Sequence, residues 1–124
     1  MIFYRFTESA RRIMSRANIA AQKYGHKCIG TEHILQGLSE EENSQAFNIL
    51  ANLKINTSII RSAIVKLTPS NNAAVPIHKR KLPQTRKAKK VIKNAIKESR
   101  RCKFKIVGTE QILLAILRAA LSIF

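Results

Sequence analysis

Residues 30–35, GTEHIL, recur at positions 108–113 as GTEQIL, a separation of 78 residues. The same separation aligns Thr7 with Thr85, and the apolar positions that follow each of them, without a gap. Two unrelated helices would share an apolar period, but they would seldom also share two cap residues and the length of a loop. The pattern therefore predicts that one helical unit has been duplicated.

Apolar residues around these motifs recur with the spacing of helices that bury one face. Thr7 is expected to cap a helix that ends at Gly25 in a left-handed conformation, and Thr31 is expected to cap a second helix through Leu38. Further helices are predicted at 44–53, after Asn56, after Thr85, and from Thr109 to about residue 124. The apolar residues expected to face inward from the helix after Asn56 are Ile59, Ile60, Ala63, Ile64 and Leu67.

These elements predict an all-α fold, a single domain over 1–124 built as a tandem pseudo-twofold helical repeat. The first repeat is placed at 6–67 and the second, incomplete repeat at 84–124. The segment 68–83 contains all three prolines of the chain and is predicted to be a linker. Because an incomplete repeat leaves apolar side chains near Ile116 without cover, we expect a partner or a second copy of the chain to cover them.

Composition excludes several classes of function. The chain has 124 residues with 23 Lys and Arg against 7 acids, all of them Glu, and a net charge of +16. Without Asp and without a GxxxxGK[ST] loop, an autonomous ATPase is excluded, and we expect no cofactor and no enzymatic activity. No apolar run approaches the ~20 residues of a membrane span, so no membrane partner is expected. His26 and His33 have no third ligand nearby in the sequence, so no metal site is expected.

The basic charge is concentrated between Lys79 and Lys105, where Glu98 is the single acid. This stretch would suit a solvated helix face, an acidic protein partner or a nucleic acid. Phe104 is the only aromatic residue in it, so a platform for stacking bases is lacking and nucleic acid is the least favoured partner.

Taken together, residues 6–38 and 85–117 resemble the tandem repeat of Clp ATPase N-terminal domains (the Clp repeat family), especially those of the ClpA/ClpC type. The resemblance covers roughly residues 2–118 and is carried by the Phe-Thr start, the Gly-His before the first loop and the GTE[HQ]IL motif in both copies. It implies two four-helix repeats with pseudo-twofold symmetry that recruit substrates and adaptors to a hexameric unfoldase and do no chemistry. The chain departs from the family at Cys102-Lys103-Phe104, where the first copy has Tyr24-Gly25-His26, so the second copy lacks the glycine cap.

The repeated motif itself can bind a ligand with two charges. A helix start offers free N–H groups and the positive end of the dipole to an anion, and a first-turn carboxylate can hold a guanidinium in bidentate fashion. The resemblance implies that Thr7 with Glu32, and Thr85 with Glu110, bind phosphoarginine. The residues that would support these helix starts are Gly30, Thr31, Gly108 and Thr109. The alternative is that all of these residues only cap helices.

The sequence thus predicts a non-enzymatic recognition module of the Clp chaperone-protease system, either stand-alone or truncated. Its expected partners are Clp ATPase and protease subunits and adaptor or client proteins. One alternative is a solitary accessory that docks on the Clp protease core or its chaperone and regulates assembly. Another is a basic nucleic-acid-binding helical protein. With the two cysteines far apart and no signal segment, we expect a plastid stroma or a bacterial cytoplasm.

Overall fold

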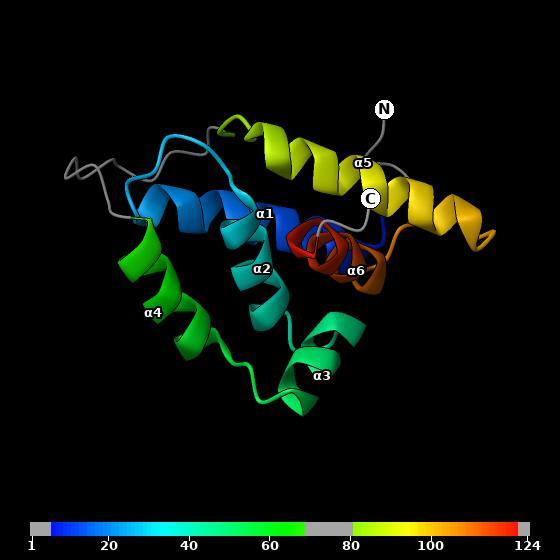
Figure 1. Cartoon of the computed structure of the whole chain (residues 1–124), viewed down its shortest axis with the longest axis horizontal. Helices are drawn as coiled ribbons and strands as arrows, with labels where there is room; N and C mark the ends of the chain where they lie inside the picture. The colour runs from blue at the N-terminus through cyan, green and yellow to red at the C-terminus, as the bar shows by residue number, and fades with distance from the viewer. Residues whose placement is uncertain (1–5, 69–80, 122–124) are drawn as a thin grey trace.

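The computed structural model describes residues 6–68 and 81–121, and the regular elements there are all helices (Figure 1). They are α1 (Glu8–Lys23), α2 (Thr31–Glu40), α3 (Gln45–Asn52), α4 (Thr57–Leu67), α5 (Arg86–Arg101) and α6 (Thr109–Ala120). The predicted all-α class is confirmed. Most of the predicted linker, 68–83, lies outside the described residues.

Four helices begin at a residue whose side chain caps them, and three of these caps, Thr7, Asn56 and Thr85, were predicted. In each, the side-chain oxygen of the N-cap residue accepts a hydrogen bond from an amide in the first turn, which satisfies a donor that the helix leaves unpaired. The four caps are Thr7, Ser44, Asn56 and Thr85.

The starts of α2 and α6 correct the prediction by one residue. Gly30 and Gly108 are the N-caps, and the two threonines expected to cap these helices, Thr31 and Thr109, are their first helical residues. The Gly30 amide donates to His33 Nδ1 at 2.8 Å, and the Gly108 amide donates to the Gln111 Oε1 atom at 2.7 Å. In both copies the side chain of the third helical residue thus makes its half of a capping box, and glycine has no side chain to make the other half.

Backbone hydrogen bonds join the two copies symmetrically. Thr7 donates its amide hydrogen to the Val107 carbonyl, and Thr85 donates its amide hydrogen to the Ile29 carbonyl, both at 2.9 Å. Ile29 and Val107 are equivalent positions of the repeat, so each bond is the image of the other when the copies are exchanged. In keeping with this relation, α1 and α5 run in opposite directions (Figure 1). The pseudo-twofold arrangement is therefore present in the structure.

The core is formed mainly by α1 and α2 of the first copy and α5 and α6 of the second. Its fully buried aliphatic side chains include Ile13, Ile34, Leu38 and Ile112. At Gly37, α2 approaches α1 so closely that a Cβ atom would lie 2.8 Å from the Ile13 carbonyl oxygen. The sequence pattern did not single out this glycine, because its role depends on the neighbouring helix.

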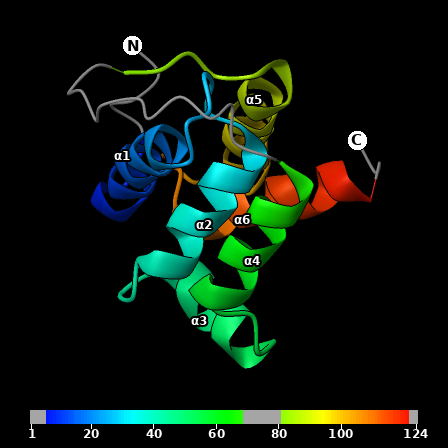
Figure 2. The same ribbon diagram turned by 90° about the vertical axis from the view of Figure 1, so that its left-hand side faces the viewer.

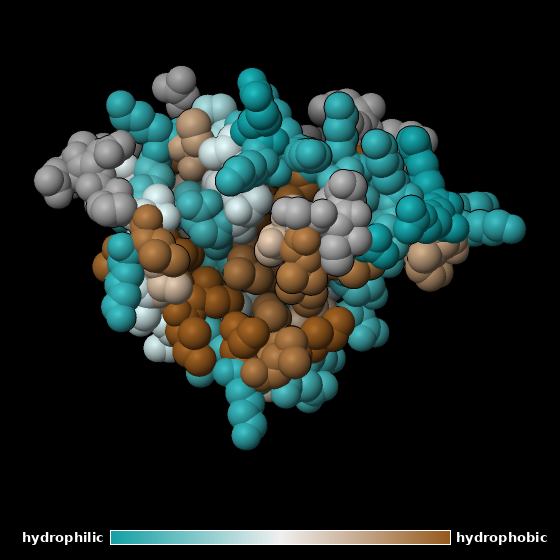
Figure 3. Space-filling model, in the orientation of Figure 1, coloured by the Kyte–Doolittle hydropathy of each residue, from teal (hydrophilic) through white to brown (hydrophobic). Residues whose placement is uncertain are grey.

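The predicted inward face of α4 is partly wrong. Ile60 and Ile64 are buried, whereas Ile59 is 53% and Leu67 81% exposed, and Ala63 is also exposed. The reason is that α4 packs mainly against α2, so a single neighbour covers only part of its apolar circumference. Figure 3 shows the result as apolar side chains gathered on the face that carries α3, α4 and the end of α6.

The ends of α1 and α5 share a backbone conformation despite different residues. Gly25 has a φ of 73°, as predicted, and the equivalent residue in the second copy, Lys103, has a φ of 62°. A side chain in this left-handed region costs about 1 kcal/mol, because its Cβ crowds the following carbonyl oxygen. The second copy therefore has the same turn, with a lysine in place of the glycine that would adopt this conformation most easily.

Candidate functional site

The two predicted threonines cap helices and face the opposite copy. The Thr7 hydroxyl accepts from the Ala10 amide, and the Thr85 hydroxyl accepts from the Ala88 amide, each at 3.1 Å. Each hydroxyl keeps its own hydrogen as a donor for a further acceptor. Both threonines are half-buried, so they remain accessible from solvent.

The structure pairs the predicted residues across the copies. The Thr7 amide bonds to Val107, which immediately precedes Gly108 and the helix that carries Glu110. By the same geometry, Thr85 lies beside the start of α2, the helix that carries Glu32. The grouping of Thr7 with Glu32 and of Thr85 with Glu110 stays a prediction, and the backbone bonds place each threonine beside the helix start of the opposite copy.

Both glutamate side chains fold back over the helix start. A Cβ atom on Gly30 would lie 1.9 Å from Glu32 Oε1, and one on Gly108 would lie 2.1 Å from Glu110 Oε1. A carboxylate at this place is stabilised by the positive end of the helix dipole. The carboxylates are partly exposed and can accept hydrogen bonds from a cation such as a guanidinium. Glu32 also accepts a hydrogen bond from the Thr68 hydroxyl at 3.4 Å.

The equivalent threonines that begin α2 and α6 have different surroundings. Thr109 is 3% exposed and accepts a hydrogen bond from the Ala46 amide at 3.2 Å, which fixes the start of α3 against α6. Thr31 is partly exposed and lines a groove. The symmetry of the repeat is therefore broken at this pair of residues.

His26 and His33 form a chain of hydrogen bonds. The sequence pattern raised these two residues only as metal ligands and predicted no metal site there. Because His33 Nδ1 accepts the Gly30 amide hydrogen, its own proton is on Nε2, which donates to His26 Nδ1 at 2.8 Å. His26 Nε2 then donates to the Thr68 carbonyl at 2.9 Å. This chain ties the start of α2 to the end of α4 and uses all four ring nitrogens.

The surroundings of His33 favour its neutral form. Burial lowers the pKa of His33 to about 4, with His26 acting in the same direction and the Glu32 carboxylate acting against both. The Tyr24 ring stacks on His26 with 5.5 Å between ring centroids. Within the described part of the chain, no group of three or more His, Cys, Asp or Glu side chains is placed to hold a metal ion.

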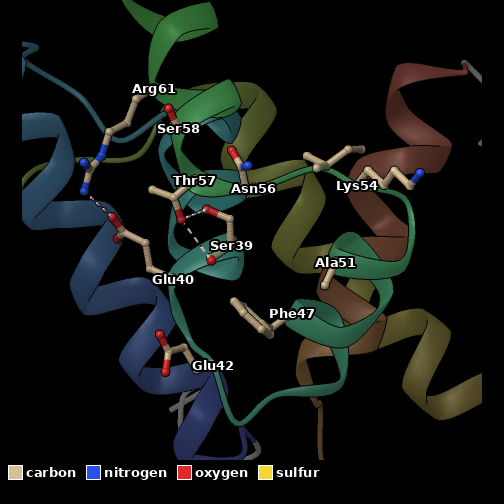
Figure 4. Close-up of a pocket in the computed structure, with 11 residues that line it drawn as sticks. Ser39, Glu40, Glu42, Phe47, Ala51, Lys54, Asn56, Thr57, Ser58 and Arg61 are labelled. Carbon is tan, nitrogen blue, oxygen red and sulfur yellow. Dashed lines mark hydrogen bonds and ion pairs between the residues drawn. The ribbon is translucent and has the colours of Figure 1, made fainter.

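A cleft of about 670 Å³ lies between the end of α2 and the helices α3 and α4 (Figure 4). Glu40 pairs with Arg61 at 3.2 Å on one side, and the Thr57 hydroxyl donates to the Ser39 carbonyl at 3.0 Å. Phe47 and the aliphatic part of Lys54 lie on the other side (Figure 4). The cleft thus combines side chains of both charges with an apolar wall.

The basic exterior predicted for the second copy lies on α5, whose Lys and Arg side chains are exposed. Glu98 pairs with Arg101 at 3.8 Å and with Arg118 at 3.5 Å. No helix in the described ranges 6–68 and 81–121 is long and apolar enough to cross a membrane.

A family model described as the Clp repeat (R) N-terminal domain matches residues 5–123. The chain belongs to this family. The Clp repeat domain is the substrate- and adaptor-binding module of Clp ATPases and is a protein-interaction domain, not a catalytic one.

Curated relatives are found in a plastid and in bacteria. The chain is 36% identical over 118 residues to the ATP-dependent Clp protease ATP-binding subunit ClpC of Staphylococcus aureus, covering 95% of this chain and 14% of that protein. It is 33% identical over 117 residues to the chloroplastic chaperone protein ClpC2 of Oryza sativa, covering 94% of this chain and 12% of that protein. The chain thus spans a small part of the length of these relatives.

Solved structures show the same fold. The N-terminal domain of ClpD from Arabidopsis thaliana aligns with a TM-score of 0.75 at 23% identity, covering 94% of this chain and 77% of that one. A ClpV N-domain in complex with a VipB peptide aligns with a TM-score of 0.75 at 16% identity, covering 96% of this chain and 71% of that one.

Proposed function

We propose that the chain recruits proteins to the Clp chaperone-protease system, and that it binds phosphoarginine side chains at two composite sites. The sites are Thr7 with Glu110 and Thr85 with Glu32. The observation that carries the proposal is the pair of crossed backbone bonds from Thr7 to Val107 and from Thr85 to Ile29. Each bond sets a capping threonine beside a helix start whose first turn carries a glutamate.

The chemistry of each site suits a ligand with both charges. The threonine hydroxyl hydrogen and the positive end of the helix dipole favour a phosphate. The carboxylate that now lies over the helix start can turn toward a guanidinium, and the phosphate can take its place at the dipole. Membership of the Clp repeat family supports a partner that is a protein, as does the peptide that the ClpV N-domain binds.

The test is calorimetric titration of the whole chain with a peptide that bears phosphoarginine. Wild type should bind two peptides, and Glu32→Gln should remove one of them. The double variant with Glu110→Gln should lose most of the binding, about 10- to 100-fold in affinity, because each charged hydrogen bond contributes about 1.5–3 kcal/mol. The matched control is Glu42→Gln, which removes an exposed carboxylate at the Figure 4 cleft and should leave the affinity unchanged. Equal binding by the double variant and the control would refute the site assignment.

The accessory role remains a second candidate for the same fold, in a plastid stroma or a bacterial cytoplasm. A binding experiment distinguishes this accessory role from recruitment: the chain is immobilised, and purified Clp protease core and Clp chaperone are added separately. Recruitment predicts that chaperone and client are retained, whereas an accessory of the core predicts that the protease subunits are retained without a chaperone.

A further inference from the structure

A groove lies between the start of α2, the first half of α5 and the end of α6, away from the cleft of Figure 4. It encloses about 430 Å³ and is lined chiefly by Thr31, Lys87, Lys90, Val91, Ile116 and Ala119. Figure 2 shows the C-terminal half of α6 extending beyond the other helices. Its side chains Leu117 and, at the helix end, Leu121 are 45% and 68% exposed.

The residues of this groove have equivalents in the other copy of the repeat, where α3 covers the corresponding surface. Thr31 corresponds to Thr109, and Ile116 corresponds to Leu38. Thr109 and Leu38 are 3% and 0% exposed, and α3 packs against both α2 and α6. The Ala46 amide, in the first turn of α3, donates to the Thr109 hydroxyl. The first copy therefore shows which kind of segment fits such a groove.

The filled surface also encloses an acidic group. Glu41, at the end of α2 and just before the turn into α3, is 5% exposed, and its carboxylate accepts hydrogen bonds from Arg12 and, at 3.4 Å, from Arg16. These two arginines lie on α1 and hold the turn that leads into α3. A carboxylate followed by a short helix is thus the element that completes the first copy.

At the open groove, hydrogen-bond donors stand in place of the two arginines, but no carboxylate stands in place of Glu41. Lys90 stands where the first copy has Arg12, and Asn94 stands where it has Arg16. Asn94 is 8% exposed, and its Nδ2 atom has no hydrogen-bond partner among the described residues. The position equivalent to Glu41 is Ala119, which carries no charge. Lys87, one turn before Lys90 on α5, adds a second positive charge to the lining of the groove.

We infer that this groove binds another protein through a segment in which an acidic residue precedes a short amphipathic helix. The acid would pair with Lys90 and accept from Asn94, and the apolar side of the helix would cover Ile116 and the end of α6. A second copy of this chain is a poor occupant, because two chains of charge +16 repel each other and the one segment of this kind in the described chain, Glu41–Leu50, is folded in its own place. The inference goes beyond the recruitment sites, since it uses neither Glu32 nor Glu110.

The probe is a fluorescein-labelled peptide with the sequence of residues 40–53, EEENSQAFNILANL, which fills the equivalent surface of the first copy. Fluorescence anisotropy with the whole chain should show saturable binding that weakens with salt. Lys90→Glu should weaken it by about tenfold, because it places a like charge against the acid of the peptide. Lys97→Glu makes the same charge change at an exposed position of α5 outside the groove and should change the affinity by less than about twofold.

Two further measurements isolate the groove. A peptide with Gln in place of its Glu41 should bind several-fold more weakly to wild type but no more weakly to Lys90→Glu, since the pair is already lost. Ala119→Glu, at an exposed position, places a carboxylate beside Lys90 and should abolish binding. The Glu32→Gln, Glu110→Gln double variant should bind this peptide as wild type does, which separates the groove from the phosphoarginine sites.

The inference is overturned if the peptide does not bind, or if Lys90→Glu and Lys97→Glu weaken it equally. It is also overturned if light scattering gives the mass of two chains, rather than 14.0 kDa, and Ala119→Glu restores the single chain, because a second copy would then fill the groove. Circular dichroism of each variant verifies that the helices are intact.

Discussion

His26 Nδ1 and His33 Nε2 lie 2.8 Å apart inside the first copy, and the proton between them completes a chain of hydrogen bonds from Gly30 to Thr68. The arrangement requires the His33 ring to be neutral, because a second proton on it would displace the Gly30 amide from Nδ1. Stability of the fold is thereby linked to pH.

We predict that the free energy of unfolding falls as pH falls from about 6.5 toward 4. Burial holds the pKa of His33 at about 4 in the folded chain, below its value of about 6.5 when unfolded, so the unfolded state binds more protons throughout this window. The slope contributed by one such group is at most about 1.4 kcal/mol per pH unit. Urea unfolding at several pH values measures it.

The variant His33→Gln isolates this effect. Gln111 has the equivalent place in the second copy, where its Oε1 accepts the Gly108 amide, so the variant should keep the cap and remove the titrating ring at position 33. Between pH 5 and 6.5 its stability should therefore fall less steeply than that of wild type. A slope as steep as that of wild type would mean that other groups cause the dependence.

Gly37→Ala should destabilise the fold by about 1–3 kcal/mol. Alanine in a helix normally stabilises by about 1 kcal/mol relative to glycine, but here its Cβ would lie 2.8 Å from the Ile13 carbonyl oxygen. Thermal and urea unfolding give the sign. A gain in stability would show that α1 and α2 can move apart at no cost.

Lys103→Gly should stabilise the chain by about 1 kcal/mol, because glycine adopts the left-handed conformation at φ 62° without strain. The matched change is Gly25→Lys, at φ 73° in the first copy, which should destabilise by a similar amount. Lys105→Gly serves as a control for removing a nearby lysine. Equal responses at positions 103 and 105 would argue against a backbone origin.

Thr109→Val should cost about 1–3 kcal/mol, because it leaves the buried Ala46 amide without an acceptor while keeping the shape of the side chain. Thr31→Val makes the same change at the equivalent helix start, where the side chain is partly exposed, and should alter stability by less than about 0.5 kcal/mol. Chemical denaturation of the two variants compares them directly. Equal costs would contradict the asymmetry of the repeat.

Features set by neighbouring residues were predictable from the sequence. Thr7 and Thr85 cap their helices as expected, and Gly25 ends α1, because each depends on hydrogen bonds within one turn. The partners of these residues were not predictable. Thr7 lies beside Val107 because one copy packs on the other. The repeat in the sequence suggested pairing within each copy instead.

The features that the sequence pattern missed have the same origin. Ile59 and Leu67 have the spacing of a buried face, yet α4 has too few neighbours to cover them. For His26 and His33 the sequence predicted no metal site, but it gave no sign of the hydrogen bonds from their ring nitrogens to Gly30 and Thr68. Both features depend on contacts between elements, which the periodicity of one element does not reveal.

The crossed bonds also constrain the order in which the chain can be made and folded. Thr7 begins the first helix, but its acceptor on Val107 is synthesised about 100 residues later. During translation α1 can pack against α2, but the bond that joins its N-cap to the second copy must wait for the closing of this long loop. A ribosome stalled before residue 107 should hold a nascent chain that proteases cut readily.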